Sequence, residues 1–323
     1  LSMSLLVFFG GRGVIFNEIA LGDFVAFQSY LFTLAWPMMG IGFAMNIFQR
    51  GGASLTRVEN ILKTKSAIKE PEKPVRISRF ENIVFENVNF GYNGDLTLKN
   101  INWRIERGKF IGLVGRIGSG KSTLLKLLVR LYDPLGGKIL LNGIELPLFS
   151  TKELHRIIGY VPQETMLFST TIKENIAFAQ PTANIEEIKR LAKLVEIYDE
   201  IMEFTDGFET VIGERGVTLS GGQRQRIAIA RTLFMNPEVI VLDDALSSCD
   251  AETEKKILEN ILTQYGDKTI IVATHRLNTI KNADEIIVLD NGEIKGVGKH
   301  EELLRKCEAY WKLYEVEKLK AFI

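Results

Sequence analysis

The stretch GRIGSGKST, Gly115 to Thr123, constrains this chain most, because it matches the pattern G-x-x-x-x-G-K-[ST]. An apolar β-type run, FIGLVG, precedes it, and a helical run, STLLKLLVRLY, follows it. Glycines in such a loop let backbone N–H groups wrap phosphates, and the N-terminus of the next helix adds partial positive charge. Strand, glycine loop and helix in this order therefore predict a phosphate-binding loop.

The residue types within this loop predict how it holds a nucleotide. We expect Lys121 to reach the β- and γ-phosphates and the Ser122 hydroxyl to bind Mg²⁺. The loop residues expected to bind the nucleotide are Gly115, Arg116, Ile117, Gly118, Ser119, Gly120, Lys121, Ser122 and Thr123.

A second apolar run, VIVLDD, ends on a pair of carboxylates. We expect Asp243 to hold Mg²⁺, through water, as the second element of the phosphate-binding site. Asp244 follows at once, and its role as a catalytic base depends on whether its side chain reaches the attacking water.

Apolar β-type runs alternate with helical patterns from Glu81 onward. This alternation predicts an α/β domain with a largely parallel sheet. The formal net charge of zero gives no reason to expect a nucleic-acid partner. Cys249 and Cys307 fit no metal-binding spacing and are expected to be reduced thiols.

The run from Phe24 to Phe48 carries no charged residue. About 20 apolar residues span a hydrocarbon core of ~30 Å, so the run predicts a membrane helix. Its polar residues and Pro37 favour one face on protein or a cavity. A buried core helix of a soluble domain is the alternative. Basic residues follow the run and acidic residues precede it, which predicts that its C-terminal side is cytoplasmic.

These patterns predict three regions. Residues 1–62 are expected to be the C-terminal part of a transmembrane domain, with a partial span at about 1–14, a full span at about 23–48 and a helix continuing into the cytoplasm. Residues 63–80 are expected to form an exposed linker, and residues 81–323 the nucleotide-binding domain. The chain is expected to be the C-terminal part of a longer protein, because two spans enclose no substrate path.

The segment TLSGGQRQRIAIARTL contains LSGGQ at the predicted start of a helix. With the two nucleotide motifs, it makes residues 81–323 resemble the ATP-binding-cassette (ABC) family. The resemblance implies a P-loop NTPase fold: a RecA-like core, an antiparallel β subdomain and a helical subdomain that carries LSGGQ. It also implies ATP and Mg²⁺ as cofactors and head-to-tail dimers, in which Ser220, Gly221, Gly222 and Gln223 contact the ATP of the other subunit.

The resemblance carries further positions over one by one. Tyr92 matches the aromatic residue that stacks on adenine, with a packed surface tyrosine as the alternative. Gln163 matches the glutamine that senses Mg²⁺ and the attacking water. Asp250 matches the acid that crosses the dimer interface, and His275 the histidine that contacts the γ-phosphate. His155 and His300 match no motif and are expected to be surface residues.

The order of the regions resembles that of exporter half-transporters of this family. Glu214 and Arg215, in VIGERG, resemble the exporter element that contacts the membrane domain, with a solvated charged loop as the alternative. The resemblance implies a second half-transporter as partner, in a homodimer or heterodimer, and a multi-pass protein of the plasma membrane with a cytoplasmic nucleotide-binding domain. The transported substrate, whether a small molecule, a lipid or a peptide, stays open.

Asp244 departs from the family pattern, which has Glu at this position. Its side chain is one methylene shorter, and a misplacement of about 1 Å can cost on the order of 10²-fold in rate. Such a change resembles the degenerate half of a heterodimer. The alternative is an ATP-binding regulatory or structural subunit with little hydrolysis of its own. A soluble ABC protein acting on DNA or ribosomes is disfavoured by the apolar run and the neutral charge.

Overall fold

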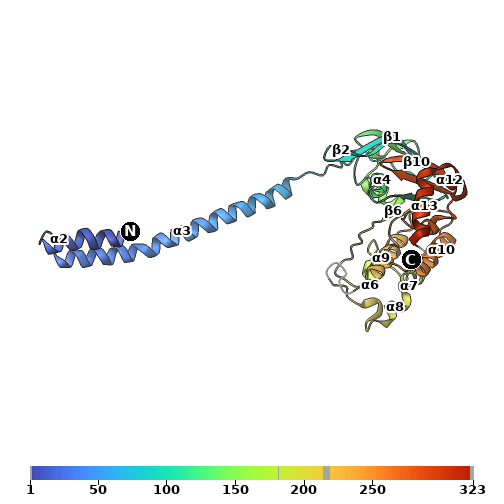
Figure 1. Cartoon of the computed structure of the whole chain (residues 1–323). Helices are drawn as coiled ribbons and strands as arrows, with labels where there is room; N and C mark the ends of the chain where they lie inside the picture. The colour runs from blue at the N-terminus through green and yellow to red at the C-terminus, as the bar shows by residue number, and fades with distance from the viewer. Residues whose placement is uncertain (1, 181, 214–218, 321–323) are drawn as a thin grey trace. The chain divides into compact units, whose positions relative to one another are not determined.

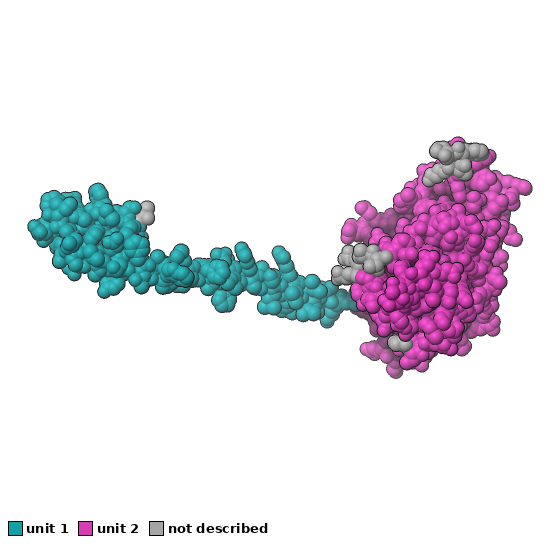
Figure 2. Space-filling model, turned by 90° about the horizontal axis from the view of Figure 1, so that it is seen from below, with its two compact units in different colours: residues 1–66 teal, residues 67–323 magenta. Residues whose placement is uncertain are grey.

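The computed structural model of the chain describes residues 2–180, 182–213 and 219–320. Internal contacts divide the chain into a unit of residues 1–66 and a unit of residues 67–323, which Figure 2 shows in teal and magenta. Each unit is described by itself.

The first unit is helical. A short stretch of helix, Ser2–Leu5 (α1), Leu6–Gly10 (η1, a π-helix) and Gly11–Ile15 (α2), precedes the long helix Leu21–Lys63 (α3). All of α3 is described, and none of its residues is buried. Within the described residues, α3 is the one helix long and apolar enough to cross a membrane, by length and composition. At 1.5 Å per residue it extends over roughly 65 Å, about twice the ~30 Å hydrocarbon core.

Polar residues inside the apolar part of α3 bond to the helix backbone. Ser29 Oγ donates to the carbonyl of Val25, and Thr33 Oγ1 donates to the carbonyl of Ser29. The hydroxyls of Ser29 and Thr33 therefore have hydrogen-bond partners within the helix and need no water. One turn after Thr33, Pro37 lies inside the helix and has no N–H to donate to the carbonyl of Thr33.

The second unit is built around a mixed sheet with strand order β10-β9-β3-β8-β7-β6. Its strands are Phe110–Gly115 (β3), Ile158–Val161 (β6), Val239–Asp243 (β7), Thr269–Ala273 (β8), Glu285–Asp290 (β9) and Glu293–Gly298 (β10). All neighbours pair in parallel except β10, which runs antiparallel to β9. The predicted α/β fold with a largely parallel sheet is confirmed.

Both faces of this sheet are covered, as expected for parallel strands. In β3, Phe110 and Val114 pack into one buried cluster, whereas Ile111 and Leu113 pack into the other. The apolar runs read from the sequence are continuous rather than alternating because each strand buries both of its faces.

An antiparallel sheet with strand order β2-β1-β4-β5 packs over one of these faces. Its strands are Asn82–Tyr92 (β1), Asp95–Glu106 (β2), Gly136–Leu141 (β4) and Ile144–Glu145 (β5), followed by Leu146–Leu148 (η2) and Thr151–Ile157 (α5). Helix α4, Lys121–Leu128, lies between this sheet and β3, with buried residues on most of its surface.

A helical lobe forms the other end of the unit, as Figure 1 shows. It contains Ile172–Ile176 (α6), Ile185–Leu194 (α7), Tyr198–Glu203 (α8), Gly207–Glu209 (η3) and Gly221–Phe234 (α9). Capping boxes begin α6 at Thr171 and α9 at Ser220, so these helix starts are set by local sequence. The β subdomain and the helical subdomain expected from the family resemblance are both present.

The segment predicted to be an exposed linker is partly docked on the second unit. Arg130 donates to the carbonyl of Lys69 (3.0 Å), and Arg156 donates to the carbonyl of Ile77 (3.2 Å). The side chain of Phe80 is fully buried. The other residues of the segment are exposed or partly exposed, as predicted.

The C-terminal helices are Ala251–Gln264 (α10), Leu277–Ile280 (α11), His300–Lys306 (α12) and Glu308–Lys320 (α13). The prediction that His300 is a surface residue is wrong. Its ring is buried, and Nδ1 lies 2.7 Å from the hydroxyl of Tyr310, which is itself buried. His155 is exposed, as predicted.

We expect Gly137→Ala to destabilise the protein far more than Gly143→Ala. Both glycines have positive φ, +75° and +78°, a conformation that costs an alanine roughly 1–2 kcal/mol. A Cβ on Gly137 would also lie 2.3 Å from the carbonyl oxygen of Asn87, whereas a Cβ on Gly143 meets open space. Denaturant unfolding of the two variants measures the difference, and equal losses of stability would contradict this packing.

Burial lowers the pKa of His300 below its ordinary value of 6.5. A base with a depressed pKa stabilises the fold above about pH 6.5, and this stability is lost as the pH falls, because the unfolded state binds the proton more tightly. We therefore expect the free energy of unfolding to fall more steeply between pH 7 and 5 in the native protein than in His300→Gln. Parallel pH profiles would show that His300 does not contribute.

Candidate nucleotide-binding site

The carboxyl ends of three parallel strands meet at one edge of the main sheet. Leu113 of β3 and Asp243 of β7 both align with Ala273 at the end of β8. The loops that follow these strands carry the glycine-rich segment, the acidic pair and His275. Ligands bind at this edge in open α/β sheets.

Lys121 is the first residue of α4, and its side chain folds back into the glycine-rich loop. Its Nζ donates to the carbonyl oxygens of Gly115 (2.8 Å) and Arg116 (3.2 Å), and only 7% of the residue is exposed. Burial lowers the pKa of Lys121, while the nearby carboxylates of Asp244 and Asp243 raise it. A buried ammonium whose hydrogen-bond acceptors are neutral carbonyl groups favours the binding of an anion, because an anion compensates its charge.

Asp243 joins the glycine-rich loop to the end of β7. Ser122 Oγ donates to its Oδ1 (3.0 Å), and the hydroxyl of Tyr160 donates to its Oδ2 (2.9 Å). Burial, and then the carboxylate of Asp243, raise the pKa of Tyr160, which therefore stays a donor at neutral pH. Tyr160 was not predicted from the sequence, although its place near the end of β6, beside β7, could have indicated it.

Asp244 lies where this edge meets the loop after β8. Its backbone N–H donates to the carbonyl of Ala273 (2.9 Å), and its φ of +50° lies in the left-handed region, which Asp adopts more readily than most residues. Gln163 Nε2 approaches its Oδ2 at 3.4 Å. Burial raises the pKa of Asp244, whereas the charges of His275 and Lys121 lower it. Gln163, Asp243, Asp244, Lys121 and His275 are thus brought together.

The residues of this edge fit a nucleotide phosphate and a Mg²⁺ ion. Ser119 Oγ is buried in the glycine-rich loop and, within the described part of the chain, has no hydrogen-bond partner. Ser122 and Asp243 supply the hydroxyl and carboxylate oxygens that Mg²⁺ prefers. Among the described residues, there is no cluster of three or more His, Cys, Asp or Glu that could hold a metal ion.

Tyr92 is held beside α4 at the end of β1. Its hydroxyl lies 3.4 Å from Thr123 Oγ1, and its ring contacts Phe90 and Tyr132 edge-on. Tyr92 is 38% exposed, so part of its surface is free to contact a base. Tyr132, which the sequence analysis did not single out, completes this aromatic group.

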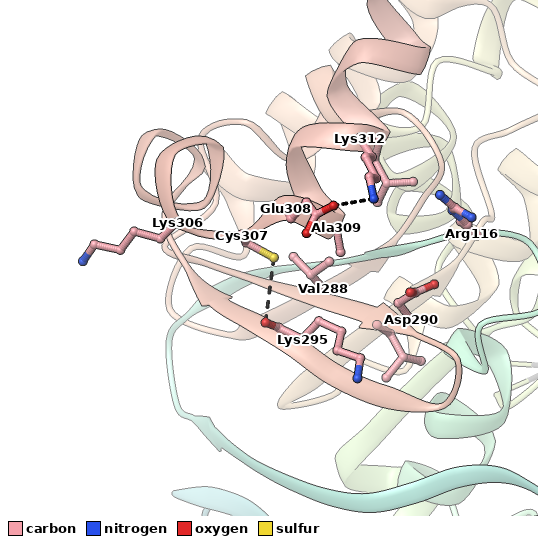
Figure 3. Close-up of a pocket in the computed structure, with 11 residues that line it drawn as sticks. Arg116, Val288, Asp290, Lys295, Lys306, Cys307, Glu308, Ala309 and Lys312 are labelled. Atoms are coloured by element: carbon pink, nitrogen blue, oxygen red, sulfur yellow. Dashed lines mark hydrogen bonds and ion pairs between the residues drawn. The ribbon is translucent and has the colours of Figure 1, made fainter.

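A pocket of about 390 Å³ borders the loop at Arg116, between β9, β10 and the C-terminal helices. Figure 3 shows its lysines and the pairing of Lys312 with Glu308. Lys295 pairs with Glu293, and Lys306 pairs with Glu302. The charges of these three lysines are therefore already paired with carboxylates.

The LSGGQ segment has its own network within the helical lobe. Ser220 caps α9, exchanging hydrogen bonds with Gln223, and Gln223 Nε2 donates to Glu200 (2.8 Å). Arg226 of the same helix forms a bidentate pair with Glu200. In the described part of the chain, the hydrogen bonds of Ser220 and Gln223 do not reach the glycine-rich loop of the same chain.

Other predicted positions have separate surroundings. Gly221 and Gly222 lie against Ser248 and Cys249, next to Asp250. The carboxylate of Asp250 caps α10 by accepting from the N–H groups of Glu252 and Thr253, and these bonds lower its pKa. Glu214 and Arg215 lie outside the described residues.

The fold and this site define a P-loop nucleotide-binding domain. Residues 98–247 match the sequence profile of the family described as ABC transporter. The chain therefore contains the ATP-binding domain of the ABC transporter family.

Relatives agree with this assignment. The chain is 40% identical, over 313 residues, to the probable multidrug resistance ABC transporter ATP-binding/permease protein YheI of Bacillus subtilis (strain 168), covering 96% of the chain and 54% of that protein. It is also 40% identical, over 318 residues, to the alpha-hemolysin translocation ATP-binding protein HlyB of Escherichia coli O157:H7, covering 98% of the chain and 45% of that protein.

A solved structure extends the comparison to the fold. The chain is similar to a bacterial Atm1-family ABC exporter with ATP bound, with a TM-score of 0.78, 34% identity, and coverage of 93% of this chain and 53% of that one. The chain spans about half the length of the relatives it matches.

We expect Tyr160→Phe to destabilise the protein by about 1.5–3 kcal/mol, because the buried carboxylate of Asp243 loses a hydrogen-bond donor. Tyr132→Phe removes a hydroxyl from an exposed ring at the same site and should change stability by less than about 0.5 kcal/mol. Denaturant unfolding of both variants tests this. A neutral Tyr160→Phe would show that the bond to Asp243 contributes nothing.

Proposed function

We propose that this chain is the C-terminal part of an ABC exporter subunit that binds MgATP and couples ATP binding and hydrolysis to transport. The convergence of Lys121, Ser122 and Asp243 at one edge of the parallel sheet carries this proposal. The long apolar helix α3 supports a place in a membrane, with residues 1–62 belonging to a transmembrane domain and residues 81–323 to a cytoplasmic nucleotide-binding domain.

Each residue of the site has a proposed part in ATP hydrolysis. Lys121 exchanges its carbonyl partners for the β- and γ-phosphates, and the loop from Gly115 to Thr123 wraps them with N–H groups. Ser122 and Asp243 would hold Mg²⁺, with Gln163 beside it; the ion neutralises charge on the phosphates.

His275 contacts the γ-phosphate, and Asp244 accepts the proton of the attacking water. Tyr92 stacks on adenine.

We propose that a second half-transporter completes the site. Ser220 to Gln223 begin α9 and are hydrogen-bonded within their own lobe, which supports their presentation to the ATP of a partner subunit. A helix N-terminus of this kind favours phosphate. Asp250 would lie at the same subunit interface.

Asp244 makes this chain's own site the slow one. Its carboxylate is shorter than the usual glutamate by one methylene, which shortens its reach to the attacking water. In a heterodimer whose partner carries a glutamate, the fast site would be the partner's, completed by Ser220 and Gly222 of this chain. The second candidate, an ATP-binding subunit without turnover of its own, rests on the same features.

The substrate class stays open. The relatives are named for multidrug resistance in one case and for alpha-hemolysin translocation in another, so their names point to different cargoes. A drug, a lipid or a peptide each fits the proposed exporter.

We expect Asp244→Glu to raise the kcat of the homogeneous whole protein on the order of 10²-fold, because the longer side chain regains its reach to the attacking water. ATPase rates at saturating MgATP measure this, with the Kd for ATP determined in parallel. Assays well below the unfolding temperature are needed, because glutamate tolerates the positive φ at this position less readily than aspartate.

Asp244→Asn serves as the matched control, because it keeps the length of the native side chain without its charge. The exporter proposal predicts that it removes the residual turnover and leaves ATP binding. Equal kcat for Asp244 and Glu would show that Asp244 already serves as base. ATP binding with no turnover in either protein would support the regulatory candidate.

A further inference from the structure

Arg276, which directly follows His275, binds the loop that carries the acidic residues. Its Nη1 donates to the carbonyl of Cys249 (3.2 Å), and its Nη2 donates to the carbonyl of Ser247 (3.3 Å). The same guanidinium pairs with Glu254 of α10. One side chain thus spans from the loop after β8 to the loop after β7.

Glu254 is the fixed end of this connection. Its carboxylate is buried, and its Oε1 accepts a hydrogen bond from Thr279 Oγ1 of α11 (2.6 Å) while its Oε2 accepts from Arg276. Its backbone N–H donates to the carbonyl of Asp250, so it lies in the first turn of the helix that Asp250 caps. A buried carboxylate with both oxygens satisfied holds its partners in one geometry.

The loop held by Arg276 also carries Asp244. Ser247 donates from both its N–H (3.2 Å) and its Oγ (2.8 Å) to the carbonyl of Asp244. Arg276 donates a hydrogen bond to the carbonyl oxygen of the same Ser247. A shift of this loop is therefore transmitted to Asp244 and, through the guanidinium, to the residue next to His275.

The start of α11 is also bound from its other side. Glu317 of α13 accepts a hydrogen bond from the N–H of Leu277 (2.7 Å), and Arg276 N–H donates to Thr274 Oγ1 (3.0 Å). The backbone around His275 is held by these bonds, and the side chain of Arg276 adds a connection to the 244–250 loop beside the hydrogen bond from Asp244 N–H to the carbonyl of Ala273.

We propose that Arg276, anchored by Glu254, is a positioning residue that fixes His275 relative to Asp244. This inference rests on the proposed ATPase function. Arg276 touches neither phosphate nor water in this role; it sets the spacing of two groups that act on the same γ-phosphate. Loss of the Arg276 side chain lowers kcat and leaves the affinity for ATP nearly unchanged, because Lys121 and the glycine-rich loop bind ATP independently of Arg276.

A lysine at this position does not replace the arginine. The planar guanidinium directs separate N–H groups at Glu254, Cys249 and Ser247, whereas an ammonium is a point charge on a flexible stem. Arg276→Lys keeps the charge beside Glu254 and loses the connection, so it separates geometry from charge.

The test compares Arg276→Lys with Lys256→Ala in the whole purified protein. Lys256 lies on α10 and pairs with Glu252 on an exposed surface, so its removal controls for the loss of an ion pair. We expect Arg276→Lys to lower kcat roughly 10- to 100-fold with the Kd for ATP changed by less than about twofold, and Lys256→Ala to change neither. Native kcat in Arg276→Lys, or a kcat that falls together with the affinity for ATP, would overturn the proposal.

Hydrogen exchange of the nucleotide-free protein supplies a readout that needs no ATPase activity. We expect Arg276→Lys to accelerate exchange both at Ser247 to Cys249 and at Leu277 and Thr279, whose N–H groups are hydrogen-bonded in the native protein. Acceleration in only one of the loops, or in neither, would overturn the coupling. A native protein that neither binds nor hydrolyses ATP would refute the proposed function, and the exchange result would still decide the coupling.

Thr279→Val provides a second variant if Arg276→Lys does not fold. It removes one partner of Glu254 and leaves the guanidinium in place. A smaller effect in the same direction, on kcat and on exchange in both loops, is expected. No effect on either would count against Glu254 as the anchor.

Discussion

Parallel pairing of β3 with β8 and of β8 with β7 places the ends of these strands in one row. The glycine-rich loop, the acidic pair and His275 come from distant parts of the sequence, and this pairing alone makes them neighbours. The hydrogen bond from Ser122 to Asp243 then joins the first loop to the second strand. Because the strands are buried on both faces, the row of strand ends is rigid before any nucleotide arrives.

Burial at this row has opposite effects on the charged groups. It lowers the pKa of Lys121 and raises the pKa of Asp244, and each charge counteracts the shift of the other. The ammonium of Lys121 contacts carbonyl groups that a phosphate would replace, so binding an anion would offset the free-energy cost of burying its charge.

The sequence predicted the α/β fold and the nucleotide loop because both depend on local patterns: short apolar runs, and glycines at fixed spacing before a helix. Features that depend on packing between distant segments could not be predicted. Tyr160 reaches Asp243 only because β6 pairs beside β7, and His300 is buried only because Tyr310 of α13 covers it. The positive φ of Asp244 likewise follows from the tertiary arrangement of the loops. The same holds for the hydrogen bond from Arg276 to the carbonyl of Ser247. The roles of the site residues and the boundaries of the membrane region remain predictions.

We propose that this chain holds MgATP between the glycine-rich loop and Asp243. Equilibrium binding of ATP, with Mg²⁺ and with a chelator, tests it most directly in the native protein and in Asp243→Asn. We expect Mg²⁺ to strengthen binding to the native protein and this gain to disappear in Asp243→Asn, while metal-free binding persists in both. Absence of ATP binding by the native protein, or an undiminished effect of Mg²⁺ in the variant, would contradict it.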